Sequence, residues 1–155
     1  MHRLVPSLAL VLLAVPRGAV AQGSIAGTWR TEFDVGIRIV NGVESSEGKR
    51  HARITFQVKG DSIQGTWQNV DTLGAAVGAP RPLRGVVTDS GARIESVTPT
   101  AITMRRQGDE QHLLATMNYV LTVRGDTLVG TEQWVALDHS DRGPMRPFGA
   151  KRELR

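Results

Sequence analysis

The chain has 155 residues, enough for one ordinary domain and too few for two. It contains no cysteine, which excludes disulfide bonds, thiolate zinc sites and cysteine nucleophiles. With 22% charged and 40% hydrophobic residues, its composition is that of a folded globular protein. The formal net charge is +4, and it falls to +2, from 17 basic and 15 acidic residues, if a segment containing Arg3 and Arg17 is removed. So small an excess does not indicate a nucleic-acid-binding protein.

The N-terminus has the layout of a secretory signal peptide. Met1-His2-Arg3 is a short basic start, residues 4–15 are an apolar run, and Ala19-Val20-Ala21 is a small-x-small cleavage site. This run is too short to span a bilayer core of about 30 Å as a helix. We therefore predict a signal peptide over residues 1–21 and one domain over residues 22–155. That domain is expected in the periplasm or the medium, without integral membrane association.

The rest of the chain alternates apolar and polar residues with a period of two, which is typical of half-buried antiparallel strands. Lys59-Gly60-Asp61-Ser62 and Arg124-Gly125-Asp126-Thr127 each predict a two-residue hairpin turn. The predicted strands, with no helix between them, cover residues 24–35, 53–59, 62–69, 83–88, 92–97, 100–106, 112–124, 127–137 and 147–154.

Consecutive strands without helices must either stack as two sheets or close on themselves. Successive hairpins favour a meander, and closure of a meander into an up-and-down barrel removes the sheet edges. The predicted fold is therefore all-β, an antiparallel up-and-down meander that closes into a single barrel of about eight or nine strands. A barrel of this size is filled by its own side chains or holds one small ligand.

One sequence pattern recurs where strands begin. Residues 58–66 (VKGDSIQGT) match residues 123–131 (VRGDTLVGT), and the second half of the pattern recurs at residues 24–28 (SIAGT). Two copies continue as Gly-x-Trp, at Gly27-Thr28-Trp29 and Gly65-Thr66-Trp67. A glycine inside a strand lets a sheet bend sharply, as barrel closure requires. We interpret the pattern as one strand-start device that is used three times.

A first strand that reads Ile-x-Gly-x-Trp, at Ile25, Gly27 and Trp29, resembles the calycin superfamily of lipocalins, fatty-acid-binding-like proteins and avidins. The resemblance implies that Trp29 packs at the closed end of the barrel under an arginine of the last strand, and Arg152 is the matching residue. Glu132-Gln133-Trp134 followed by a short last strand is also similar to avidins, but no tryptophan-rich biotin cage can be matched.

The interpretation that we favour is an exported, non-catalytic barrel that binds a small lipophilic molecule in its interior. If strand alternation holds, Glu132 points inward and would pair with Arg152 on the neighbouring strand, so that both would be polar anchors. A bulge would instead turn Glu132 outward, and the sequence leaves both alternatives open. The candidate ligand-binding residues are Trp29, Phe33, Phe56, Trp67, Met104, Met117, Tyr119, Glu132, Trp134 and Arg152.

Two other interpretations stay open. In the first, the barrel is solid and binds a protein partner, such as an exported enzyme, through long loops at residues 36–52 and 70–82. A meander places both loops at the same end, and the second loop is small and apolar, which would also suit a lid over a ligand. In the second interpretation, Glu132 acts as an acid on a substrate bound in a cavity. No nucleophile motif is found, so no catalytic residue is assigned.

The sequence gives no grounds for a metal, a cofactor or a nucleic-acid partner. His51, His112 and His139 lie far apart and lack the spacing of metal ligands. Exposed aromatic residues spaced for base stacking are missing. We therefore predict no metal site, no cofactor and no nucleic-acid binding.

Overall fold

The computed structural model describes residues 24–35, 38–40, 43–106 and 108–153; for residues 38–40, 43–44 and 104–106 it describes the backbone alone. The predicted signal peptide, residues 1–21, lies outside the described residues, and so does residue 154 at the end of the last predicted strand. Within the described ranges, no helix is long and apolar enough to cross a membrane.

Regular structure in the described residues consists of strands. They are β1 (Gly27–Val35), β2 (Arg38–Val40), β3 (Val43–Ser45), β4 (Gly48–Lys59), β5 (Ser62–Val70), β6 (Arg81–Thr88), β7 (Gly91–Ser96), β8 (Thr100–Arg106), β9 (Asp109–Arg124), β10 (Thr127–Ala136) and β11 (Arg146–Arg152). Each of the nine predicted strands corresponds to one of these, with boundaries that differ by a few residues. The short hairpin of β2 and β3, and the early start of β4, lie in the segment predicted as the loop 36–52.

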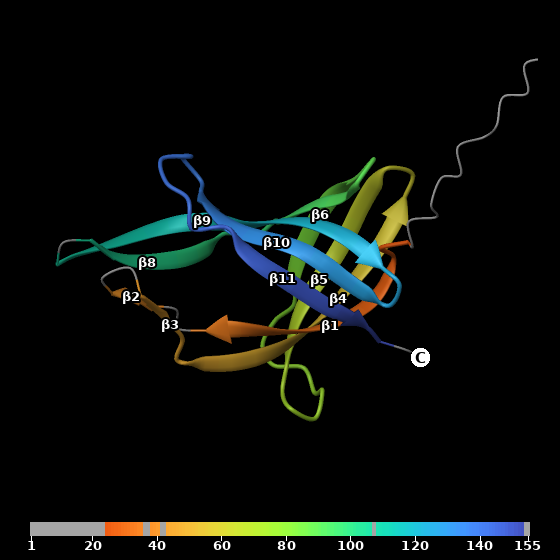
Figure 1. The fold of residues 1–155 in the computed structure, drawn as a ribbon, viewed down its shortest axis with the longest axis horizontal. Coiled ribbons are helices and arrows are strands. Elements are labelled where there is room, and N and C mark those ends of the chain that lie inside the picture. Colours follow the sequence, from red (N-terminus) through yellow and green to blue (C-terminus); the bar gives the residue numbers. More distant parts are fainter. Residues whose placement is uncertain (1–23, 36–37, 41–42, 107, 154–155) are drawn as a thin grey trace, which may run out of the picture.

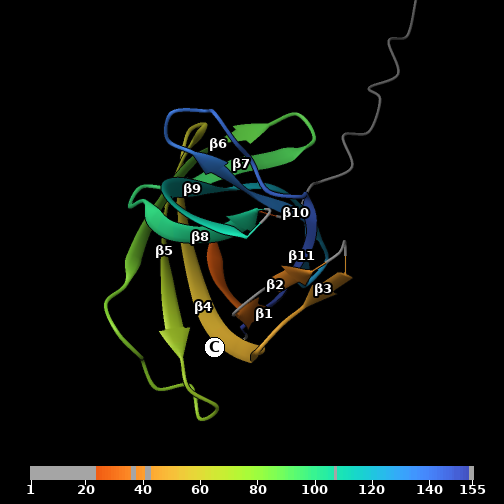
Figure 2. The ribbon, with the colours of Figure 1, turned by 90° about the vertical axis from the view of Figure 1, so that its left-hand side faces the viewer.

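The strands form a closed barrel. One antiparallel sheet has the order β10-β11-β1-β4-β5-β6-β7-β9-β8, and β10 also pairs with β9. This second pairing closes eight strands into a barrel in meander order and leaves β8 as an extra strand (Figures 1 and 2). β8 pairs with the first half of β9, and their hairpin projects beyond the barrel (Figure 1). The predicted all-β meander barrel is confirmed.

The two ends of the barrel differ in their connections. At one end, which we call the closed end, short turns at residues 60–61, 89–90 and 125–126 join the strands. Gly60 and Gly125 there have φ of 60° and 62°, as the predicted two-residue hairpins require. The other end, which we call the open end, has the longer connections of the barrel, at residues 36–47, 71–80, 97–108 and 137–145.

Inward-facing side chains fill the centre of the barrel. Towards the open end four rings form an aromatic cluster, in which the Trp67 centroid lies 5.3 Å from Phe33, 6.1 Å from Tyr119 and 6.4 Å from Phe148. The space beside the cluster has no room for a water molecule, and it is lined by Ile54, Phe56, Trp67, Leu83, Tyr119, Leu121 and Phe148. The described part of the barrel is therefore solid at its centre.

Glycines of the repeated pattern make room for neighbouring groups. A Cβ added at Gly65 would lie 2.7 Å from Cδ1 of Phe56, and one at Gly130 would lie 1.9 Å from the carbonyl oxygen of Val120. Close packing between strands, in addition to bending, therefore requires glycine at these positions.

We expect Gly130→Ala to lower the free energy of unfolding by about 3 kcal/mol, because the added methyl group overlaps the Val120 carbonyl and forces β9 away from β10. Urea denaturation measures the loss. Gly149→Ala on the neighbouring strand is the matched control, since an added Cβ there has nothing within 4 Å. It should change the free energy of unfolding by less than about 0.5 kcal/mol. Equal losses in the two variants would contradict this account of the packing.

Candidate functional site

Arg152 covers Trp29 at the closed end. Its guanidinium carbon lies 4.1 Å from the centroid of the ring, which is cation–π geometry. Trp29 is fully buried, and its indole Nε1 donates a hydrogen bond to the Ile25 carbonyl at 2.8 Å. Arg152 donates from Nη1 to the Ala26 carbonyl at 2.9 Å and from Nη2 to the Ser24 carbonyl at 2.7 Å. The packing that the resemblance to calycins implied is confirmed.

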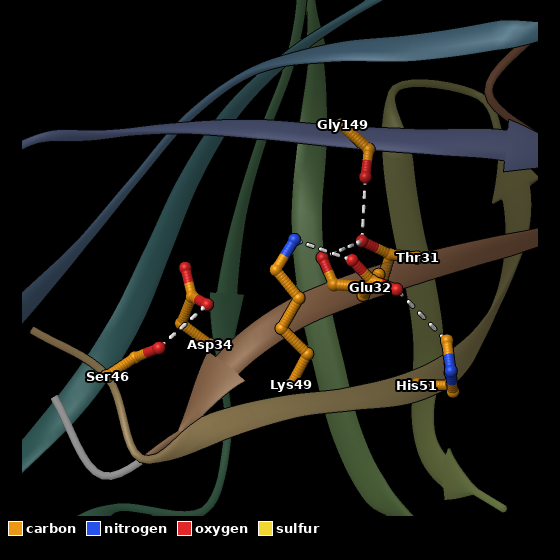
Figure 3. Close-up of polar contacts among 7 residues, drawn as sticks. All are labelled: Thr31, Glu32, Asp34, Ser46, Lys49, His51 and Gly149. Atoms are coloured by element: carbon orange, nitrogen blue, oxygen red, sulfur yellow. Dashed lines mark hydrogen bonds and ion pairs between the residues drawn. The ribbon is translucent and has the colours of Figure 1, made fainter. Parts of the chain in front are cut away.

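β1 and β11 pair only next to this contact. Their register has two pairs, Trp29 with Arg152 and Arg30 with Lys151. One residue further, Thr31 Oγ1 donates a hydrogen bond to the Gly149 carbonyl at 2.6 Å (Figure 3). From there towards the open end the two strands separate (Figure 1). The barrel is thus closed between its first and last strands mainly at the closed end.

The outer face of β1 has an exposed group of charges near this junction. Lys49 Nζ donates to Glu32 Oε1 at 2.7 Å, and His51 Nδ1 lies 4.0 Å from Glu32 Oε2 (Figure 3). The hydrogen bond from Lys49 lowers the pKa of the Glu32 carboxyl. Ser46 Oγ donates to Asp34 Oδ1 at 3.2 Å in the same region. Because these side chains are largely exposed, their ion pairs add little to stability, and we assign them no binding role.

Glu132 points into the barrel near the open end. β10 pairs with β9 from Thr127 to Ala136 in one uninterrupted register. Leu128 and Ala136, which share the strand face of Glu132, are both buried. Of the two alternatives that the sequence left open, the register therefore selects the inward orientation and excludes the bulge.

The register places Glu132 between Tyr119 on β9 and Arg146 on β11. Burial raises the pKa of the Glu132 carboxyl; Arg146 opposes the rise and Asp34 reinforces it. Burial, together with the nearby Glu132 carboxyl, also holds the pKa of the Tyr119 hydroxyl well above its usual range, and Arg81 works against this shift. The three residues are therefore electrostatically coupled within the wall of the barrel.

The predicted pairing of Glu132 with Arg152 is wrong. Arg146 is the residue opposite Glu132, while Arg152 is opposite Trp29. The two arginines are six positions apart on β11, which corresponds to about 20 Å along the strand. Both arginines lie on the same face of β11, so strand alternation cannot distinguish them, and only the register between β10 and β11 decides which one meets the carboxylate.

Arg81 adds a second cation at the open end. It is the first residue of β6, on the same strand face as the buried Leu83, and its guanidinium carbon lies 5.5 Å from the Trp67 ring centroid. We call Arg81, Tyr119, Glu132 and Arg146 the open-end polar group. It adjoins the aromatic cluster, since Tyr119 belongs to both and Arg81 pairs with Trp67, and it contains two guanidinium groups and one carboxylate.

The sequence-based site omitted Arg81 and Arg146. The signal that identifies them is their spacing, because each lies two residues before a buried inward-facing hydrophobic residue, Leu83 and Phe148 respectively. Long cationic side chains at the first residue of a strand are usually solvated, so composition alone does not mark them as inward-facing.

The remaining predicted ligand-binding residues are dispersed. Phe56 is buried in the solid centre, and Met117 is half-buried against the core. Trp134 packs against Gly143 of the β10–β11 connection, where an added Cβ would lie 2.1 Å from the indole Nε1. The side chain of Met104 lies outside the described residues, although its backbone belongs to β8.

The connection at residues 71–80 projects away from the barrel (Figures 1 and 2). Asp71 Oδ1 accepts hydrogen bonds from the backbone of Leu73 at 2.9 Å and of Ala75 at 2.8 Å. Gln68 Nε2 donates to the carbonyls of Val77 and Gly78 at 3.1 Å. These bonds hold the loop in one shape with Leu73 92% exposed. A lid would face the mouth of the barrel, so this geometry does not support the interpretation as a lid.

Neither a cluster of metal-ligating side chains among the described residues nor similarity to known proteins assigns a function to this chain. The described part of the chain contains no group of three or more His, Asp or Glu side chains placed to hold a metal ion. Comparisons of the chain with family models, with curated proteins and with solved structures found no match. The open-end polar group is therefore identified by its geometry and electrostatics.

We expect Glu132→Gln to change the pH dependence of stability in a defined direction. Because the pKa of Glu132 is raised in the folded protein, its contribution to stability is fully present below the ordinary carboxyl pKa and is lost as the pH rises through the folded pKa. The free energy of unfolding of Glu132→Gln, relative to wild type, should therefore increase from pH 4 to pH 7. Urea denaturation across this range measures it, and a relative stability that falls with pH would contradict the inward, desolvated position.

Proposed function

We propose that this chain is an exported, non-catalytic binding protein that takes up a small lipophilic molecule with an acidic or polar end. The observation that carries the proposal is Glu132, held inward between Tyr119 and Arg146 beside the aromatic cluster. A carboxylate whose pKa is raised by burial reduces the stability of the fold, so a role in binding accounts for its inward position.

The charge of the open-end polar group favours an anionic or hydrogen-bond-accepting head group. The group contains two guanidinium groups, from Arg81 and Arg146, and guanidinium groups bind carboxylates in a planar, two-pronged geometry. The adjacent aromatic cluster offers apolar contact for the rest of the ligand. Since the centre of the barrel has no room for water, the ligand would lie in the mouth of the barrel.

The closed end and the N-terminus support the same proposal. An eight-stranded meander barrel with Arg152 packed on Trp29 is what the resemblance to calycins implies, and that superfamily includes carriers of small lipophilic molecules. The signal-peptide layout of residues 1–21 supports export. Glu132 would then position a head group, with Arg146 in the anchoring role that the sequence alone gave to Arg152.

Decanoate should bind the wild-type protein in a one-to-one complex, detected by native mass spectrometry after purification without detergent. Arg146→Met should weaken this binding by at least about tenfold, because it removes a guanidinium beside the head group. Lys151→Met, on the exposed face of the same strand, is the matched control. Equal binding by the Arg146→Met and wild-type proteins would contradict the proposal.

A second candidate function is a solid-barrel interaction protein that binds a protein partner through residues 36–52 and 70–82. The observation in its favour is Leu73, which lies exposed in a loop held by the hydrogen bonds that Asp71 accepts and Gln68 donates. Val77 of the same loop is 51% exposed, and exposed apolar patches, unlike single residues, mark sites of protein contact. Absence of any bound decanoate in the wild-type protein would favour this candidate.

A further inference from the structure

A cavity lies at the closed end, away from the open-end polar group. Its volume is about 240 Å³, and one side of it opens to solvent. Its walls are mainly aliphatic side chains from four strands and from the segment before β1, namely Ile25, Val58, Val87, Ala92, Leu121 and Val123. We call this cavity the closed-end pocket.

The segment that forms one wall of the closed-end pocket is held in place by the barrel. The carbonyls of Ser24 and Ala26 accept hydrogen bonds from Arg152, and the carbonyl of Ile25 accepts one from Trp29. Ser24 and Ile25 line the pocket, and Ile25 is buried. Three consecutive residues are thus fixed by hydrogen bonds from the side chains of Arg152 and Trp29, so this wall of the pocket is held in position by the barrel.

Val87 shows that the pocket leaves apolar surface uncovered. It shares a face of β6 with Leu83, which is 5% exposed, yet Val87 itself is 39% exposed. An inward-facing valine at a barrel end is normally covered by a neighbouring side chain. Here the covering group is missing among the described residues, and the uncovered surface faces the pocket.

We propose that the closed-end pocket binds a neutral lipophilic molecule of about ten non-hydrogen atoms. The size follows by proportion from an apolar cavity of about 150 Å³, which holds benzene. The ligand is neutral because none of the described lining residues has a charged side chain, so an ion would lose its hydration without a partner. This site is separate from the open-end polar group, because the solid centre of the barrel lies between them.

Naphthalene is a suitable probe, since it has ten carbon atoms and no polar group. It is titrated into the protein labelled with ¹³C at the valine methyl groups, and binding is followed by methyl chemical shifts. We expect saturable shifts of Val87 and Val123, which line the pocket, and none of Val120, whose side chain is 55% exposed on the outer face of β9. Unshifted Val87 and Val123 methyl groups would overturn the proposal.

Two neighbouring variants provide the matched test. Val87→Phe fills the pocket and should weaken naphthalene binding by at least about tenfold, whereas Val86→Phe, on the outer face and 49% exposed in the wild type, should leave it unchanged. Equal weakening in both variants would overturn the proposal. Valine shifts that depend on protein concentration without naphthalene would assign the pocket to a second copy of the chain and would also overturn it. The wild-type titration stands even if a variant is destabilised.

Discussion

The contact between Arg152 and Trp29 joins the last strand of the barrel to the first. Between β1 and β4 the register has nine residue pairs, but between β1 and β11 it has two, and Arg152 and Trp29 form one of them. Most other neighbouring strands are joined by hairpins that are local in the sequence, so they pair readily. No hairpin joins β1 to β11, because these two strands lie at opposite ends of the chain, so their pairing carries a larger entropic cost. The cation–π contact and the hydrogen bonds from Arg152 to the segment before β1 add stabilising interactions to this ladder of two residue pairs.

This arrangement divides the barrel into three parts with different chemistry. The closed end has short turns and an uncharged pocket whose wall depends on Arg152. The centre is filled by side chains, and the aromatic cluster fills its part towards the open end. The open end has the longer connections and the charged residues of the open-end polar group. A ligand at either end would therefore be recognised independently, by hydrocarbon contact at the closed end and by charge at the open end.

The strand pattern could be predicted from the sequence because half-buried antiparallel strands alternate visibly and their turns contain Gly-Asp. The packing of Arg152 on Trp29 followed from the resemblance to calycins. The early part of β4 was missed, because between Gly48 and Ala52 its residues are charged or small and show no apolar period. The partner of Glu132 was assigned to the wrong arginine, because Arg146 and Arg152 share a face of β11 and alternation does not give the register. The uncovered pocket beside Val87 could not be predicted, since it depends on how side chains from several strands fill a common space.

Hydrogen exchange of the backbone amide of Glu153 tests most directly whether the Arg152–Trp29 contact closes the barrel. This N–H donates to the Thr28 carbonyl across the junction of the first and last strands at 2.9 Å. In Arg152→Met the amide should exchange at least about tenfold faster than in Lys151→Met, because the junction loses the guanidinium and its hydrogen bonds. Amides in the middle of the β4–β5 ladder should exchange at the same rate in both variants, since nine residue pairs hold that ladder independently of the junction. Equal exchange of Glu153 in the two variants would contradict the account.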